Sequence, residues 1–70
     1  MSVNRLRELR QQRNLSLAEL SKLTGVSDSS ISLIENLKRT PSVRNAMKLA
    51  KALNVQVYEI FPYNGENNTL

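Results

Sequence analysis

Residues 16–36, SLAELSKLTGVSDSSISLIEN, hold two short amphipathic segments on either side of a single glycine, and they decide the fold. Ser16 is placed to cap the amide of Glu19, while the Glu19 side chain reaches back to the Ser16 amide. This capping box predicts a helix that begins at Leu17. Gly25 supplies the left-handed backbone conformation that ends such a helix. The first segment is therefore a helix closed at both ends by local signals.

A second helix is predicted to follow almost at once. Ser27 is a good N-cap, and Asp28 at the first helical position suits the positive end of the helix dipole. Ile31 and Ile34 are spaced to point inward, and the helix is expected to reach about Asn36. Two helices joined by a glycine-containing turn of about three residues form the geometry that places the second helix in a DNA major groove.

Three more helical segments flank this pair. Apolar spacing predicts a helix over residues 3–14, and Ser42 caps another that Asn54 ends. The apolar positions of that later helix repeat at helical spacing and are Val43, Ala46, Met47, Ala50 and Leu53. A short last turn over residues 56–61 closes the core. We predict an all-α fold, a compact five-helix domain over residues 1–61 with a polar tail over residues 62–70.

Composition limits the function. The chain has 70 residues, no Cys, no His and a formal net charge of +4. It is long enough for one domain, and we predict no metal, no cofactor and no enzymatic activity because no nucleophile and base pair is present. No apolar run is long enough to cross a bilayer, so we expect no membrane partner and a cytoplasmic location. The positive charge favours polyanions but is by itself a weak signal.

The segments LRELR, LSLAELSKLTGVS, ISLIEN, KRTPS, LAKALNV and EIF, spread over residues 6–61, resemble the helix-turn-helix family of phage repressors and Cro. This is also called the xenobiotic-response-element family. The resemblance implies a lambda-repressor-like fold and a transcriptional regulator that binds double-stranded DNA, more often a repressor than an activator. We expect a homodimer on a palindromic operator whose half-sites lie about 34 Å apart.

The outward face of the second helix of the pair is the candidate for reading bases. Its positions are Asp28, Ser29, Ser32, Leu33 and Asn36. Two of them depart from the family pattern. Asp28 accepts from a cytosine amino group or caps its own helix, and we favour the cap. Leu33 contacts a thymine methyl group or belongs to a protein interface.

Phosphate contacts are expected from basic side chains and from the amide end of the first helix of the pair, where Leu17 replaces the Gln common in the family. The basic candidates are Arg10, Arg13, Lys38, Arg39 and Arg44. The resemblance also implies an ion pair between Arg10 and Glu35 that joins the first helix to the recognition helix. Each cation is alternatively an ordinary solvated surface charge.

Two leucines carry structural expectations. The family usually has Gly at the position of Leu37, where the backbone turns left-handed, so we expect Asn36 to take that conformation or the helix to run on by one residue. Leu23 is more apolar than a surface position needs, and we expect it to be a packed core residue.

The dimer surface is expected near the C-terminus, at Tyr58, Phe61, Pro62 and Tyr63, although Phe61 is equally a core candidate. An alternative function, supported by Asp28 and Leu33, is a protein-interaction module on the same scaffold, with an antagonist protein as partner. The two functions differ in their salt dependence, because DNA binding weakens steeply with ionic strength.

Overall fold

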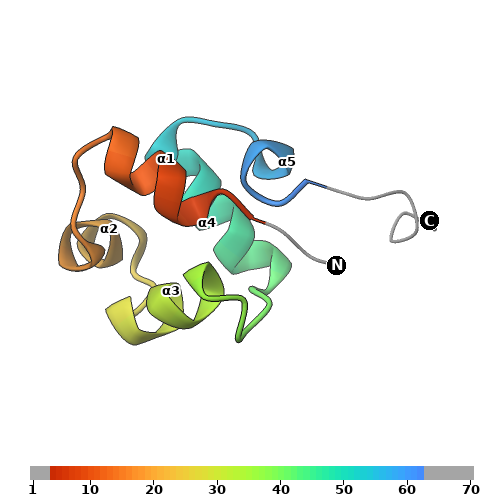
Figure 1. Ribbon diagram of the computed structural model, residues 1–70, viewed down its shortest axis with the longest axis horizontal. Coiled ribbons are helices and arrows are strands. Elements are labelled where there is room, and N and C mark those ends of the chain that lie inside the picture. Colours follow the sequence, from red (N-terminus) through yellow and green to blue (C-terminus); the bar gives the residue numbers. More distant parts are fainter. Residues whose placement is uncertain (1–3, 63–70) are drawn as a thin grey trace.

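Five helices make up the described part of the chain, residues 4–62 of a computed structural model (Figure 1). They are α1 (Leu6–Gln12), α2 (Leu17–Thr24), α3 (Asp28–Glu35), α4 (Val43–Leu53) and α5 (Val57–Ile60). The predicted all-α fold is confirmed. Within residues 4–62, none of these helices is both long and apolar enough to cross a membrane.

The first helix is shorter than the apolar spacing predicts. It begins at Leu6, whose N–H donates to Asn4 Oδ1 at 3.1 Å, and Arg5 N–H donates to the Ile60 carbonyl at 2.8 Å. These bonds hold residues 4 and 5 in a non-helical entry against α5, so the expected start at residue 3 is wrong; Val3 itself lies outside the described residues. Asn14, with φ 56°, turns the chain after the helix.

The local signals around α2 and α3 act as predicted. Ser16 Oγ accepts from the Glu19 N–H at 3.0 Å, and the Glu19 carboxylate accepts from the Ser16 N–H at 2.8 Å. Gly25 is left-handed, with φ 78°. Ser27 Oγ accepts from the Ser30 N–H at 3.1 Å and so begins α3. Gly25 therefore ends α2 on one side of the turn, and the Ser27 capping bond begins α3 on the other.

A single core lies between the helices. Its fully buried large side chains are Leu6, Leu20, Ile31, Ile34, Leu49, Leu53 and Ile60. Phe61, a core candidate as well as a predicted dimer residue, is only partly buried and packs against this cluster. Its neighbour Ile60 is fully buried in the core.

The apolar spacing of α4 predicts its inward face only in part: the predicted Ala46, Ala50 and Leu53 are buried, but Val43 and Met47 are not. Ala46, Leu49 and Leu53 are buried, whereas Val43 and Met47 are 77% and 59% exposed. Helix α4 contacts α2 and α5, and those contacts fix which side of it faces the core. Val43 and Met47 have helical spacing with the buried residues, but they lie to one side of the buried face of α4.

Leu23 is 62% exposed, so its expected place in the core is wrong. The buried side of α2 carries Leu20 and Thr24, one helical turn apart. Thr24 was not anticipated there: its hydroxyl donates to the Leu20 carbonyl at 2.8 Å and accepts from the Val26 N–H at 3.1 Å. Thr24, and not its neighbour Leu23, therefore lies on the buried side of α2, where its hydroxyl is hydrogen-bonded.

Candidate nucleic-acid interface

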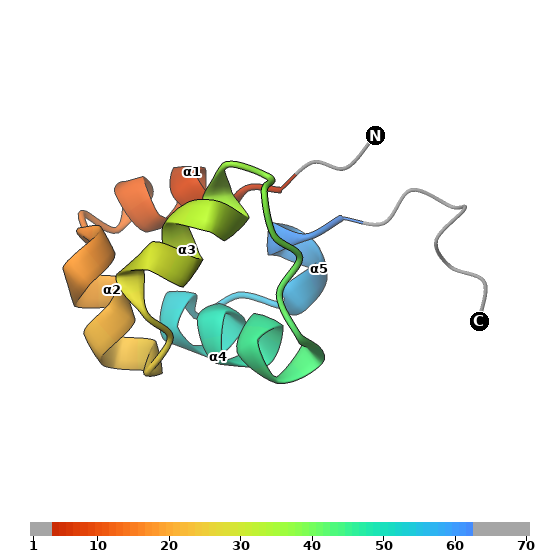
Figure 2. The same ribbon diagram turned by 90° about the horizontal axis from the view of Figure 1, so that it is seen from below.

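Helix α3 presents one face to solvent, and Figure 2 looks onto it with α1 above and α4 below. Ile31 and Ile34 are buried on its inner side. The opposite side carries Ser29 and Leu33, both exposed, and the half-buried Ser32. The outward positions predicted from helical spacing therefore do share a face.

The N-terminus of α3 is capped by Ser27, not by Asp28. The Ser27 hydroxyl supplies the capping bond to Ser30, and no hydrogen bond of the Asp28 carboxylate is found within residues 4–62. Asp28 is exposed as the first residue of the helix. Our preference for Asp28 as the cap is wrong because a hydroxyl already fills that position; its charge still lies at the favourable end of the dipole.

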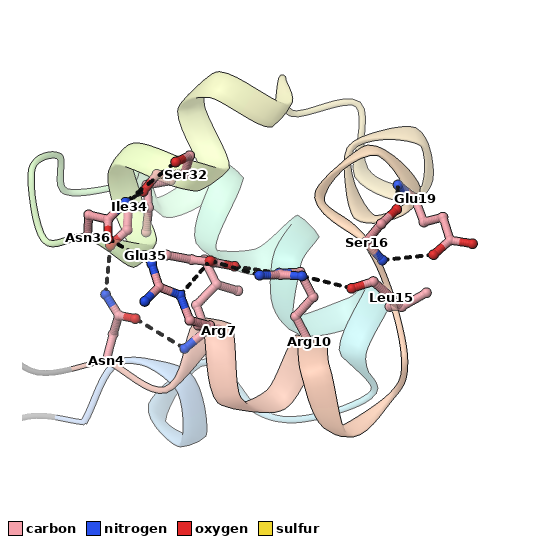
Figure 3. A network of polar contacts seen from close by, with 11 residues as sticks. Asn4, Arg7, Arg10, Leu15, Ser16, Glu19, Ser32, Ile34, Glu35 and Asn36 are labelled. Atoms are coloured by element: carbon pink, nitrogen blue, oxygen red, sulfur yellow. Dashed lines mark hydrogen bonds and ion pairs between the residues drawn. The ribbon is translucent and has the colours of Figure 1, made fainter.

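The C-terminus of α3 is tied to α1 by the expected ion pair (Figure 3). Arg10 Nε and Nη2 donate to the two carboxylate oxygens of Glu35 at 2.7 and 3.1 Å, and Nη1 donates to the Leu15 carbonyl at 2.9 Å. The two charged side chains are only 11% and 2% exposed. The hydrogen bond that Arg10 donates to Glu35 raises the pKa of Arg10. Because all three nitrogens of the Arg10 guanidinium already donate within the protein, few of its N–H groups can reach a phosphate. The phosphate contact of Arg10 stays a prediction.

A second arginine, Arg7, joins the same carboxylate and was missed by sequence reasoning. Its Nε donates to Glu35 Oε1 at 3.2 Å and its Nη2 donates to Asn36 Oδ1 at 2.7 Å. The Asn36 amide in turn donates to the Ser32 carbonyl at 2.9 Å. Asn4 Nδ2 donates to the Ile34 carbonyl at 2.9 Å. The signal available was the spacing of Arg7 and Arg10, which places both on one side of α1.

The chain reverses after α3 at Leu37 itself, with φ 61°, while Asn36 stays near the helical region at φ −91°. Lys38 N–H donates to the Leu33 carbonyl at 2.8 Å, which closes the helix in the manner usually given to glycine. Both alternatives that we expected here are wrong. Asn36 is not left-handed, because its own N–H still bonds to the Ser32 carbonyl at 3.0 Å, and the helix does not run on through Leu37, which takes the reversal itself.

The remaining cations predicted to contact phosphate are all exposed, namely Arg13, Lys38, Arg39 and Arg44. Arg39 is held beside α3, because its Nη1 donates to Ser30 Oγ at 2.9 Å. Arg13 donates to the Leu9 carbonyl at 3.2 Å. Leu17 is partly buried against the core, at the capped start of α2. Exposed cations thus lie on the loop after α3 and at the ends of α1 and α4.

Of the residues predicted for a dimer surface, Tyr58 is 64% exposed and Pro62 is exposed. Phe61 is partly buried against the core. Tyr63 lies outside the described residues. The dimer surface itself stays a prediction.

This arrangement defines a class of protein: a five-helix domain whose α2 and α3 form a helix-turn-helix, with small polar side chains on the outer face of the second helix. Residues 6–60 match the helix-turn-helix family. The chain belongs to that family, in its phage repressor and Cro branch of DNA-binding transcriptional regulators.

Similar proteins agree with this assignment. The helix-turn-helix-type transcriptional regulator MJ0272 of Methanocaldococcus jannaschii is 38% identical over 63 residues, which are 90% of this chain and 96% of that one. The restriction-modification controller protein C.AhdI of Aeromonas hydrophila superposes with a TM-score of 0.75 at 40% identity, over 79% and 83% of the two chains. The P22 c2 repressor, in complex with a synthetic operator, has a TM-score of 0.75 at 33% identity, over 80% and 86%.

Proposed function

We propose that this chain is a transcriptional repressor that binds a two-fold symmetric operator as a homodimer in the cytoplasm, without enzymatic activity. The observation that carries the proposal is the outer face of α3, where Ser29 and Leu33 are exposed beside the cation Arg39, which is held against Ser30. The similar P22 c2 repressor forms a complex with a synthetic operator, which supports DNA binding by this chain.

In this proposal, specificity comes from short side chains. The hydroxyls of Ser29 and Ser32 donate to or accept from base edges, and Leu33 contacts a thymine methyl group. Asp28 accepts from a cytosine amino group. This donor is the partner that a carboxylate finds in the major groove, where the negative phosphates otherwise disfavour it. Small contacts of this kind give modest discrimination for each base pair, about 1 to 3 kcal/mol.

Affinity comes from the flanking charges. Arg13, Lys38, Arg39 and Arg44 contact phosphates, and the N–H groups at the start of α2, beside Leu17, bind another. One short helix reads only a few base pairs, so a symmetric pair of domains is needed for a useful site. The exposed Tyr58 supports a dimer surface around α5.

Selection of bound duplexes from random DNA tests the proposal. Wild type should enrich a palindrome whose half-sites are centred about one helical turn apart. The triple variant Ser29→Ala, Ser32→Ala, Leu33→Ala should fold but lose or change that preference. Lys48→Ala, an exposed cation on α4, is the control and should enrich the same palindrome.

The outcomes separate the alternatives. Failure of wild type to enrich any sequence contradicts the repressor proposal. Enrichment that the triple variant leaves unaltered means that another face reads DNA. If the chain instead captures a protein through Leu23 and Leu33, which are 62% and 36% exposed, that binding should persist at high salt while DNA binding disappears.

A further inference from the structure

We propose that Arg7 contacts a DNA phosphate next to the reading face of α3, and that Asn36 holds Arg7 in place for this contact and does not read a base. The inference rests on the proposed function, which it extends by one contact residue from α1. Its basis is the bond from Arg7 Nη2 to Asn36 Oδ1, at 2.7 Å, which brings a guanidinium to the end of the recognition helix (Figure 3).

The charge balance of the cluster leaves an excess at Arg7. Two guanidiniums, Arg7 and Arg10, share the single carboxylate of Glu35, so the three side chains together carry one positive charge. Arg10 is 11% exposed and Glu35 is 2% exposed, whereas Arg7 is 51% exposed. The uncompensated charge is therefore presented to solvent by Arg7, where a phosphate can neutralise it.

Arg7 also keeps unused donors. A guanidinium has five N–H groups, and two of them are used by Glu35 and Asn36. Three remain for a phosphate, which the planar fork binds through two parallel hydrogen bonds. Because Glu35 and Asn36 already hold the side chain, little rotamer freedom is lost when DNA binds.

Asn36 is poorly placed to read a base for the same reason. To pair with adenine, an asparagine must offer both its carbonyl oxygen and its amide N–H groups. Here Oδ1 accepts from Arg7, and Nδ2 donates to the Ser32 carbonyl at 2.9 Å with a longer bond to Ser32 Oγ at 3.5 Å. Both ends of the amide are occupied within the protein, so base reading would require both bonds to break.

The test is the salt dependence of duplex binding for wild type, Arg7→Ala and Arg7→Gln. Each lost phosphate contact should reduce the slope of log affinity against log salt by about 0.9, and the proposed homodimer loses one contact from each protomer, about 1.8 in all. The affinity gap between wild type and either variant should then shrink roughly twelvefold between 50 and 200 mM salt. The selected sequence should not change. Arg5→Ala is the matched control, because Arg5 is a similarly exposed arginine paired with Glu8, three residues further along the chain.

Asn36→Ala separates a positioning role from base reading. It should select the same sequence as wild type, and the effect of Arg7→Ala should be smaller in this background, because the guanidinium is no longer held. A changed base preference in Asn36→Ala, or an unchanged salt slope in folded Arg7→Ala and Arg7→Gln, would overturn the inference while the proposed function stands. If wild type binds no duplex at any salt concentration, the proposed function fails as well.

Discussion

Leu37 has a backbone conformation that does not suit its residue type. It is a leucine in the left-handed region, with φ 61°, and its side chain is 52% exposed. Residues other than Gly, Asn and Asp adopt this conformation at a cost of about 1 to 2 kcal/mol. The bond from Lys38 N–H to the Leu33 carbonyl, at 2.8 Å, holds the reversal in place nonetheless.

Leu37→Gly should therefore stabilise the fold. The relief of backbone strain exceeds the extra entropy that glycine gives the unfolded chain, about 0.4 to 1 kcal/mol, so we expect a net gain of about 0.5 to 1 kcal/mol. Urea denaturation measures it. Asn54→Gly is the control, at another left-handed position with φ 60°, and should gain less because Asn tolerates this region. A loss of stability in Leu37→Gly means that the side chain makes contacts worth more than the strain.

At the scale of the element, α2 shows how a helix is fixed by its own ends. The Glu19 carboxylate accepts from the Ser16 N–H at 2.8 Å. This backbone hydrogen bond, together with the bond to the Ser16 side chain, holds the pKa of Glu19 below its ordinary value of 4.5. A carboxylate with a lowered folded pKa contributes stability above its unfolded pKa, and the contribution is lost as the pH falls through the folded value.

Glu19→Gln should consequently flatten the acid limb of the stability profile. Between pH 6 and pH 3, the free energy of unfolding should fall less in the variant than in wild type, while at pH 6 the variant is the less stable of the two. Thermal melts across that range measure both. Asp28→Asn is the matched control, because Asp28 lies in the first turn of α3 and makes no hydrogen bond within residues 4–62. An equal slope for Glu19→Gln and wild type would contradict the role of the capping box.

At the scale of the whole molecule, the attachment of α1 to α3 orients the recognition helix. Arg10 and Glu35 are 25 residues apart, and the pair is nearly closed to solvent. Removing one partner of a fully buried pair costs about 3 to 5 kcal/mol, because the other charge is stranded. Here Arg7 also bonds to Glu35, at 3.2 Å, and lessens that penalty.

Arg10→Met should cost about 2 to 3 kcal/mol in urea denaturation. The double variant Arg10→Met, Glu35→Leu should lose less than the single variant, because no buried carboxylate is left without its main partner. The exposed Arg5→Met is the control and should leave the unfolding free energy nearly unchanged. If the double variant is less stable than Arg10→Met, the pair stabilises the fold through more than its stranded charge.

The sequence by itself determined the starts of α2, α3 and α4, the ends of α2 and α4, and the turn between α2 and α3. The capping bonds of Ser16, Ser27 and Ser42 each join residues three apart, so short-range pattern is enough to find them. Gly25 and Asn54 stop their helices for a local reason as well, because few residue types tolerate the left-handed conformation. The ion pair of Arg10 and Glu35 was predicted through family resemblance, with no such local rule.

The inward side of α3 followed from its spacing, but only the tertiary structure decided the inward sides of α2 and α4 and which side chains meet across the chain. Val43, Met47 and Leu23 have apolar spacing but lie outward, because the contacts of α2 with α3 and α4 select another stripe. Arg7 meets Asn36 across 29 residues. Periodicity specifies that a helix has an apolar side, but the direction of that side is set by neighbouring helices, whose positions depend on the whole fold.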